Sequence, residues 1–465
     1  MGTSEQGTTR RELLKRTAVI GVAASVPALF AESASAARRV FVTRRAAGTL
    51  VVATMPGPRW EGALRASAKT YAKANPDVKV SIAVSPFTEH YQRIGTALQT
   101  NSSDWDIFVF DRALMGQSYP KLQPLNDLFD EDKAWRDYYL KNVPAAYRGG
   151  WDWPAGKKDA VHYSVVHDAN AMMGWWRTDI FKQQGLPIPT TFDAMLANAQ
   201  KLNKLKNGSG FMTTAARDAH LAVLVTGMMW AYGGKWWEND VPNNFGNVGK
   251  DQPPGKVLLD SPEMIASMKM LKALIDVGNK ASLNGREFEN NAAFISGRNY
   301  QQLMWSGLMV LQNKRLNPKL WNKVTSADFP IGGNNKNRGK TGIKGGFGLA
   351  IPAASKMIPT AFDFCRHTTS KENGQAFILG GGQPSNAQLL NEWAKKPGFQ
   401  VFASIAKGII NGHHQGGFPE GGEFYKILFT HAGSILTGDA TPQKGCQNMK
   451  KDTERLFKRA GYSTS

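Results

Sequence analysis

The sequence predicts an α/β fold with two lobes, and three observations support this class. Over residues 49–84 a strand pattern, a helical pattern and a second strand pattern follow one another, which is the order of a parallel α/β unit. Residues 169–202 again place a strand before a helix. The chain has 465 residues, which allows two or three domains of about 100–200 residues each after removal of a leader.

The N-terminus predicts export. Arg10 and Arg11 form a twin-arginine pattern, an uncharged apolar stretch follows at residues 17–30, and Ala34–Ala36 offers a small-residue cleavage site. The apolar stretch is too short to span a bilayer stably. We therefore expect residues 1–36 to be a signal peptide of the twin-arginine route, cleaved near Ala36, and the mature protein to reside in the periplasm.

The expected elements of the first unit are short and closely spaced. The first helical pattern carries apolar residues at helical spacing and ends at Asn75-Pro76, because a residue before proline avoids the helical conformation. The expected order is a linker (37–48), a strand (49–54), a turn (56–58), a helix (60–74), a strand (78–84) and a third strand (106–110).

The stretch 163–203 carries the clearest local signals. The apolar run from Ala169 to Trp176 is long enough for a buried strand, and a short helix over 179–184 is stopped by Gly185. Thr190 or Thr191 is the expected cap of the next helix. Its apolar positions recur at helical spacing: Phe192, Met195, Leu196, Ala199 and Leu202. Ser261, followed by Pro262 and Glu263, predicts a further helix start.

Several short motifs occur in an order that resembles one known family. Trp176-Arg177-Thr178-Asp179 precedes a Gly-Leu turn with Pro189, Thr191, Phe192 and Asp193. The other motifs are Tyr71–Val80, Leu122–Asp127, Ala231–Gly234, Phe294–Gly307, Gly345–Ile351 and Ile435–Pro442. The chain resembles the bacterial extracellular solute-binding proteins of ABC transporters, family 1, which are sugar-binding and maltodextrin-binding-protein-like. The matches are spread over most of residues 49–460.

This resemblance implies the periplasmic binding protein fold, in which two α/β lobes are joined by hinge crossings and hold a ligand in the cleft between them. Crossings are expected near His167–Asn170, Met304–Gly307 and Ile351–Ser355. The expected lobes are residues 49–166 with 306–351, and residues 167–305 with 352–465. Hinge closure around a solute would then deliver it to a membrane permease.

The same resemblance nominates ligand-binding residues. Sugar rings need flat apolar faces and paired polar groups, which aromatic side chains and loop residues provide. The candidates are Trp60, Asp111, Arg112, Asp168, Trp230, Trp305, Gly345, Gly346 and Tyr425. All of them except Tyr425 have a structural alternative: helix packing or core for the tryptophans, a helix cap for Asp111, a surface ion pair for Arg112, hinge bracing for Asp168 and a tight turn for the glycines.

The net charge of +20 raises the question of an anionic partner. The basic residues are dispersed and no nucleic-acid-binding motif occurs, so no nucleic-acid partner is expected. We interpret the charge mainly as a property of the whole protein. An acidic ligand, such as a uronate or a phosphorylated sugar, stays open as an alternative.

The remaining expectations concern chemistry and partners. Cys365 and Cys446 either form a disulfide or stay as buried thiols. His413-His414 and residues 420–423 are expected to be loop, with a metal site as the minor alternative. We expect no catalytic residue, no cofactor and no enzymatic activity; the alternative is a periplasmic carbohydrate-active enzyme acting through Asp111 and Asp168. The expected partners are a small-molecule solute and the permease, or a chemoreceptor, with the protein itself a monomer.

Overall fold

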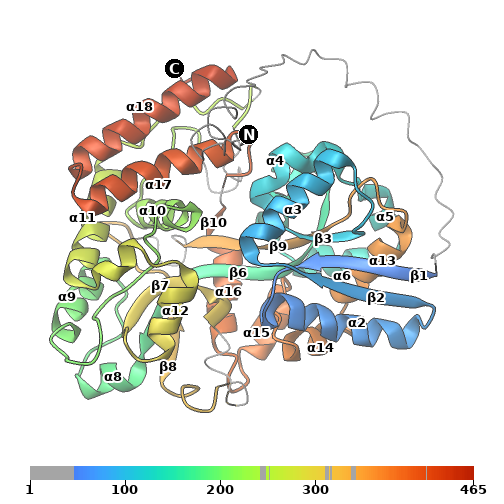
Figure 1. The fold of residues 1–465 in the computed structure, drawn as a ribbon, viewed down its shortest axis with the longest axis horizontal. Helices are drawn as coiled ribbons and strands as arrows, with labels where there is room; N and C mark the ends of the chain where they lie inside the picture. Colours follow the sequence, from blue (N-terminus) through green and yellow to red (C-terminus); the bar gives the residue numbers. More distant parts are fainter. Residues whose placement is uncertain are drawn as a thin grey trace, which may run out of the picture. The chain divides into compact units, whose positions relative to one another are not determined.

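The computed structural model describes residues 47–240, 248–250, 252–308, 314, 317–336, 342–414 and 416–464. The predicted signal peptide and nearly all of the predicted linker lie outside these ranges. Helices gather in two groups, and strands of one sheet run between them (Figure 1). Among the described residues, no helix combines the length and the apolar character needed to cross a bilayer.

One sheet extends through both groups of helices. Its main path follows the order β2-β1-β3-β9-β6-β7, with β10 beside β9 and β8 beside β6. The strands are β1 (Gly48–Thr54), β2 (Val78–Val84), β3 (Ile107–Phe110), β6 (Ser164–Arg177), β7 (Gln301–Trp305), β8 (Val324–Ala327), β9 (Ile343–Ala350) and β10 (His413–His414). A separate small hairpin pairs β4 (Asp152–Trp153) with β5 (Val161–His162).

Strand β6 connects the two groups of helices because it is long enough to pair on both sides. Its residues from Ser164 to Ala171 pair antiparallel with β9, and its residues from Met172 onward pair with β7 and β8. All of its residues except Arg177 are buried. A bulge at His167 shifts the register between Val166 and Asp168, at the first of the predicted crossings.

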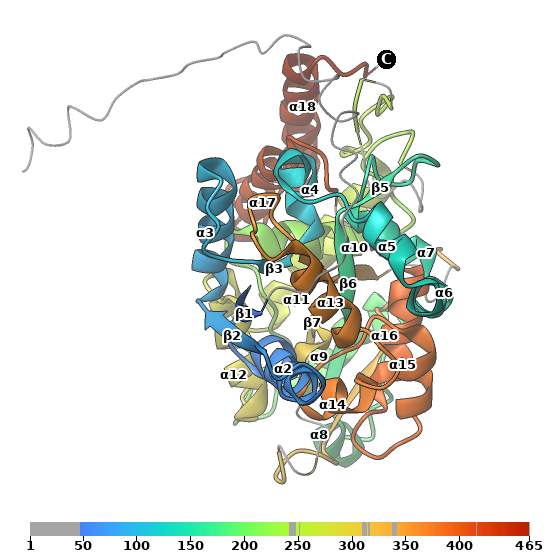
Figure 2. The same ribbon diagram turned by 90° about the vertical axis from the view of Figure 1, so that its right-hand side faces the viewer.

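The first group of helices packs around β1, β2 and β3. It comprises α2 (Ala63–Ala74), α3 (Phe87–Thr100), α4 (Met115–Ser118), α5 (Asn126–Glu131), α6 (Lys133–Asn142) and α7 (Ala145–Arg148). Two later helices, α13 (Ile358–Thr368) and α14 (Gly374–Leu379), pack against α2 (Figure 2). Next in sequence, α15 (Ala387–Trp393) packs on α16 (Val401–Asn411), which contacts β6.

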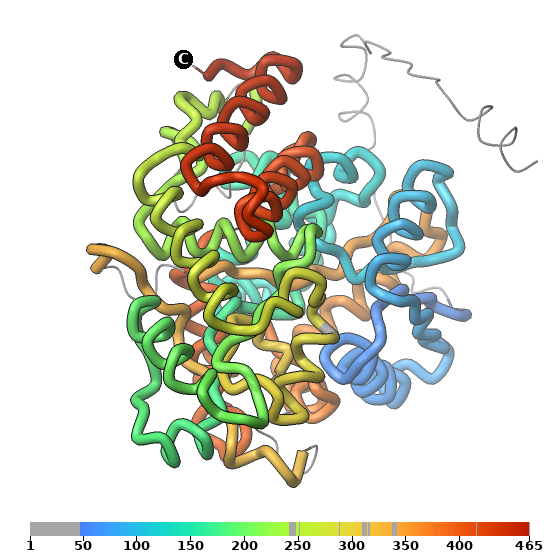
Figure 3. The backbone as a smooth tube through the Cα atoms, turned by 60° about the vertical axis from the view of Figure 1, so that its left-hand side comes forward, coloured from blue at the N-terminus to red at the C-terminus, as the bar shows by residue number. Residues whose placement is uncertain are grey.

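The second group surrounds the far end of β6. It comprises α8 (Thr178–Gln183), α9 (Phe192–Leu202), α10 (Ala219–Ala231), α11 (Pro262–Val277), α12 (Glu287–Ile295), α17 (Gly421–Thr437) and α18 (Pro442–Ala460). Helix α10 is almost entirely buried, since α17 and α11 cover it. The C-terminal helices α17 and α18 therefore lie beside segments about 200 residues earlier in the chain (Figure 3, red beside green).

Local sequence signals place most of these elements correctly. β1 pairs parallel with both β2 and β3, as the strand–helix–strand order predicts. Of the two candidate caps, Thr191 accepts a hydrogen bond from the Ala194 amide, and Ser261 caps α11 in the same way. Helix α8 is followed by Gly185 with φ of +62°.

Two expectations need correction or completion. His413 and His414 are not loop residues, because they form β10 and pair in parallel with Ile343 and Lys344 of β9. Residues 421–423 are not loop either, because they form the first turn of α17. Cys365 and Cys446 are both free, buried thiols on different helices, which decides between the two open alternatives for the cysteines. The lobe boundaries stay a prediction, although α13 and α14, assigned to the second lobe, pack on α2 of the first.

Candidate functional site

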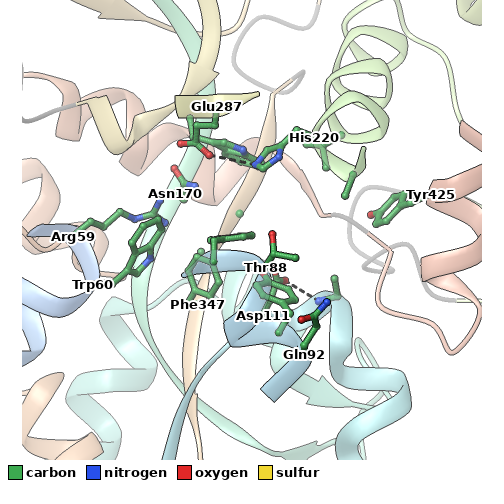
Figure 4. A pocket seen from close by; sticks show the side chains of 18 residues that line it. Arg59, Trp60, Thr88, Gln92, Asp111, Asn170, His220, Glu287, Phe347 and Tyr425 are labelled. Atoms are coloured by element: carbon green, nitrogen blue, oxygen red, sulfur yellow. Dashed lines mark hydrogen bonds and ion pairs between the residues drawn. The ribbon is translucent and has the colours of Figure 1, made fainter. Parts of the chain in front are cut away.

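A cavity of about 350 Å³ opens where the two groups of helices face each other across β6 and β9 (Figure 4). Its first wall comes from the turn of π-helix at Pro58–Gly62, from α3 and from the residues after β3. Its second wall comes from α10, α12 and α17. Asn170, Trp305 and residues 345–347 of the sheet form the floor. The cavity thus lies at the carboxyl ends of β1 and β3, where open α/β sheets bind ligands.

Six of the nine predicted site residues line this cavity. They are Trp60, Asp111, Trp305, Gly345, Gly346 and Tyr425. Residues from five separate stretches of sequence meet there because the sheet brings the end of β3, the end of β7 and the middle of β9 together.

The other three predicted residues do not line the cavity, and each is buried among different neighbours. Arg112 is 2% exposed and lies against Gly150, and burial lowers its pKa to about 10. Asp168 is fully buried behind Arg59. Trp230 is a core residue that stacks on His413 and contacts Trp236. Their roles as direct ligand contacts remain predictions.

Aromatic side chains form the apolar part of the wall. Trp60 meets Phe347 edge to face at 5.8 Å between ring centroids, and Phe87 packs beside both. Phe87 also reaches His220 on the opposite wall, at 6.2 Å. Trp305 is only 6% exposed, and its ring lies so close to β9 that a Cβ at Gly345 would come within 2.9 Å of it. The glycine is therefore needed for this close packing.

A buried ion pair supports the aromatic wall from behind. Arg59 donates from Nε and Nη2 to the two carboxylate oxygens of Asp168, at 2.9 and 2.6 Å. The same guanidinium lies over the rings of Trp60 and Phe347, at 5.0 and 5.7 Å. Burial raises the pKa of Asp168, and the charge of Arg59 opposes that shift. The pair holds Arg59 in one orientation and Arg59 in turn positions two aromatic rings.

Asn170 presents a donor to the cavity. Its Oδ1 accepts hydrogen bonds from the Ser306 amide at 3.1 Å and from the Ser306 hydroxyl at 2.6 Å. Because a backbone N–H can only donate, this contact assigns oxygen to that position and leaves Nδ2 facing the other way. Gln383 fixes Ser306 from the far side, where its Nε2 donates to the Ser306 carbonyl.

Two carboxylates supply acceptors on opposite walls. Asp111 caps the turn after β3 by accepting from the Ala113 amide at 2.9 Å, and it accepts from the Tyr91 hydroxyl. Glu287 lies 3.3 Å from Nε2 of His220. Burial disfavours the imidazolium, but the carboxylates of Glu287, Asp218 and Asp111 together raise the pKa of His220. Each acidic group is held by the protein before any ligand arrives.

Comparison with known proteins assigns the family. A profile described as bacterial extracellular solute-binding protein matches residues 57–375, well over half of the chain. The chain belongs to this family of solute-binding proteins. The family consists of binding proteins, in agreement with the expectation that the chain is not an enzyme. A comparison with curated protein sequences found no match.

Solved structures share the fold of this solute-binding protein. Maltose-bound MalE3 of T. maritima has a TM-score of 0.72 at 20% identity, covering 88% of this chain and 99% of that chain. A solute-binding protein of Agrobacterium vitis S4 with bound D-mannitol has a TM-score of 0.70 at 20% identity, covering 90% and 100%. One from Thermotoga lettingae TMO bound with α-D-tagatose has a TM-score of 0.72 at 18% identity, covering 88% and 98%. They confirm the predicted two-lobe fold.

Several residues that line the cavity of this solute-binding protein were missed from sequence. Arg59 directly precedes Trp60 in the same turn, which was a usable signal. Phe87 and Tyr91 are four residues apart at the start of α3, so they share a helix face. Glu287 gave no signal, since it meets His220 only through tertiary packing. No group of three or more His, Cys, Asp or Glu side chains within the described ranges is arranged to hold a metal ion.

Proposed function

We propose that this protein is the substrate-binding component of an ABC importer and that it binds a sugar or a sugar-derived solute. The observation that carries the proposal is the combination of flat aromatic faces with fixed polar groups in one cavity. Trp60 and Phe347 offer faces for the C–H side of a sugar ring, while Asn170 and Asp111 offer a donor and an acceptor for hydroxyls. Maltose, D-mannitol and α-D-tagatose in the similar structures favour the same class.

A thermal-shift screen tests the ligand class. The panel contains neutral sugars, polyols, uronates, sugar phosphates and polyamines, because any cleft ligand raises the melting temperature by mass action. We expect hits among the sugars or polyols and one-to-one binding by calorimetry, with the compound recovered unchanged. Hits confined to polyamines, or turnover of a sugar, would contradict the proposal.

We propose that ligand binding closes the two lobes. The cavity draws its walls from both groups of helices, and the sheet strands β6 and β9 run between them. A ligand in the cavity contacts both walls at once, so its binding favours the closed arrangement. Small-angle scattering should show a smaller radius of gyration with a saturating hit, and an unchanged radius would refute closure.

For the lobes we propose residues 49–166 with 306–351, and residues 167–305 with 352–465, with one amendment. Helices α13 and α14 pack against α2, so residues 358–379 belong with the first lobe in this proposal. Hydrogen exchange should show the amides of residues 358–379 exchanging together with those of α2. Exchange of this segment together with α10 and α11 instead would contradict the amendment.

We also propose export by the twin-arginine route to the periplasm, cleavage near Ala36, and delivery of the solute to the permease subunits by a monomer. The support is the ordered signal pattern at residues 10–36. Changing Arg10 and Arg11 together to lysine should leave the precursor in the cytoplasm, while a Lys15→Arg control should be exported. Normal export of the double variant would refute the route. Gel filtration of the mature protein tests the monomer.

A further inference from the structure

The positive charge of the chain is not concentrated at its cavity. The whole chain carries a formal charge of +20, but the ionised groups around the cavity occur mostly as pairs. Arg59 is matched by Asp168, and His220 is matched by Glu287. Asp111 is then the remaining charged side chain among the described residues that line the cavity, and the buried Arg112 next to it in sequence lies outside the lining. An anionic solute would therefore find no unmatched cation among these lining residues.

The charge of Arg59 determines whether the cavity can bind an anion. Without Asp168, its guanidinium would be an obvious partner for a ligand carboxylate, because Arg and carboxylate groups form two parallel hydrogen bonds. Asp168 already occupies that fork through Nε and Nη2. Of the three guanidinium nitrogens, only Nη1 makes no hydrogen bond to any described residue. Arg59 therefore enters the cavity wall as a neutralised donor rather than as a free cation.

We propose that the Arg59–Asp168 pair is the charge filter of the binding cavity: it selects a neutral polyhydroxy ligand, which accepts a hydrogen bond from Nη1 of Arg59, and it rejects the uronate or phosphate form. This inference rests on the proposed function and narrows its ligand class. Asp168 is a positioning residue, since it lies behind Arg59 and does not line the cavity. Arg59 is the direct contact.

The physical basis is the cost of desolvating an unmatched anion. A carboxylate entering the cavity loses hydration, finds no unmatched cation among the lining residues that the structure describes, and meets Asp111 and Glu287 on opposite walls. A neutral hydroxyl loses less hydration and is satisfied by the donors of Arg59 and Asn170. The ring of such a ligand packs against Trp60 and Phe347, which the same guanidinium holds in place.

Matched probe pairs test the filter. Each pair differs only in a hydroxymethyl or a carboxylate group: D-glucose with D-glucuronate, and D-galactose with D-galacturonate, beside D-mannitol and maltose. Titration calorimetry of the unaltered mature protein should show the neutral member bound at least tenfold more tightly. Equal or tighter binding of the uronate overturns the filter while leaving the proposed function standing. Absence of binding by every sugar and polyol, neutral or acidic, overturns both.

Two variants assign the selectivity to the pair. Asp168→Asn frees the guanidinium and should shift the uronate-to-sugar affinity ratio at least tenfold toward the uronate. Asp179→Asn is the matched control, because Arg177 and Asp179 form the same two-bond fork, at 2.9 and 2.7 Å, outside the cavity. An unchanged ratio in folded Asp168→Asn protein overturns the proposal.

A third variant covers the case in which Asp168→Asn does not fold. Arg59→Met removes the donor and keeps an apolar stem of similar length over the two rings. It should weaken binding of the neutral probe at least tenfold without creating uronate binding. Arg59→Lys keeps the charge but loses the fork, and it should restore little of the affinity. Full affinity of a folded Arg59→Met protein for the neutral probe would exclude Arg59 as the contact.

Discussion

Trp60→Ala is the sharpest test of the cavity as a ligand site. Trp60 is half-buried, lines the cavity, and touches Phe347 edge to face and Arg59 through its ring face. Truncation therefore removes one face of the site while leaving the sheet intact. Trp60 is partly exposed, and its exposed part lies at the cavity, where a ligand can contact it.

The expected loss follows from the contacts that disappear. Aromatic stacking contributes about 1–3 kcal/mol in comparable recognition, which corresponds to roughly five- to over a hundredfold in affinity. The stability cost should be smaller than the about 3–5 kcal/mol of a fully buried tryptophan, because part of the ring is already in contact with solvent. Loss of the contact between the Trp60 ring and Arg59 adds about 0.5–1 kcal/mol to this stability cost.

The assay pairs calorimetry of the tightest panel compound with urea unfolding of the same preparation. Trp105→Ala is the matched control, since Trp105 is also half-buried in the first group of helices and meets Phe108 edge to face at 5.5 Å, away from the cavity. The control should lose stability but not affinity. If Trp60→Ala binds as tightly as the control, Trp60 is not a ligand contact and our placement of the sugar face is wrong.

Three further predictions follow from buried contacts. Trp305→Ala should lose both affinity and about 3–5 kcal/mol of stability, because the ring is 6% exposed yet lines the cavity; calorimetry and urea unfolding that show a loss of only one of these would contradict this dual role. Gly346→Ala should destabilise the protein by more than about 3 kcal/mol, since its φ is +124° and a Cβ would lie 1.9 Å from the Tyr147 hydroxyl. Gly438 also has a positive φ but has open space around it, so urea unfolding should show a loss of only about 1–2 kcal/mol in the free energy of unfolding for Gly438→Ala. Equal losses for the Gly346 and Gly438 variants would contradict the steric argument. Burial, with help from the charge of Arg59, lowers the pKa of His167 to about 3 from 6.5. The unfolded chain therefore binds a proton that the folded protein does not, and stability should fall as pH drops from about 6.5 towards 3, by up to about 1.4 kcal/mol per unit. His167→Gln should flatten that slope in urea titrations at pH 7, 6 and 5, and an unchanged slope would refute the assignment.

Local chemistry made the elements predictable. A cap such as Thr191 or Ser261 acts within three residues, so its signal is present in any short window of sequence. The buried run in β6 is similarly local. The sheet order was less accessible, because β9 inserts antiparallel between β3 and β6 from almost 180 residues further along the chain. His413 and His414 illustrate the limit, since two residues without a strand pattern become a strand only by pairing with β9.

The site shows the same division between local and tertiary information. Residues that follow a strand, such as Asp111, were predictable because strand ends converge on one edge of the sheet. Asp168 was predicted as a ligand group or a hinge brace, and its surroundings depend on Arg59, 109 residues earlier. Sequence spacing could not reveal that the carboxylate is satisfied within the protein. The charge balance of the cavity depends on such pairs, so it could not be predicted from the sequence.

The polar groups of the cavity are fixed before ligand arrives, and this has a consequence for how affinity is set. Ser306 holds Asn170, Asp168 holds Arg59, and the Ala113 amide holds Asp111. Ligand binding then costs little side-chain entropy, which leaves the loss of translational and rotational freedom, desolvation and the proposed closure of the two lobes as the unfavourable terms. A substitution that loosens one of these supports should accordingly lower the affinity, even where it changes the shape of the cavity very little. Ser306→Ala removes one hydrogen bond to Asn170 without touching the ligand, so a weaker complex of unaltered stoichiometry would identify preorganisation as the source of affinity.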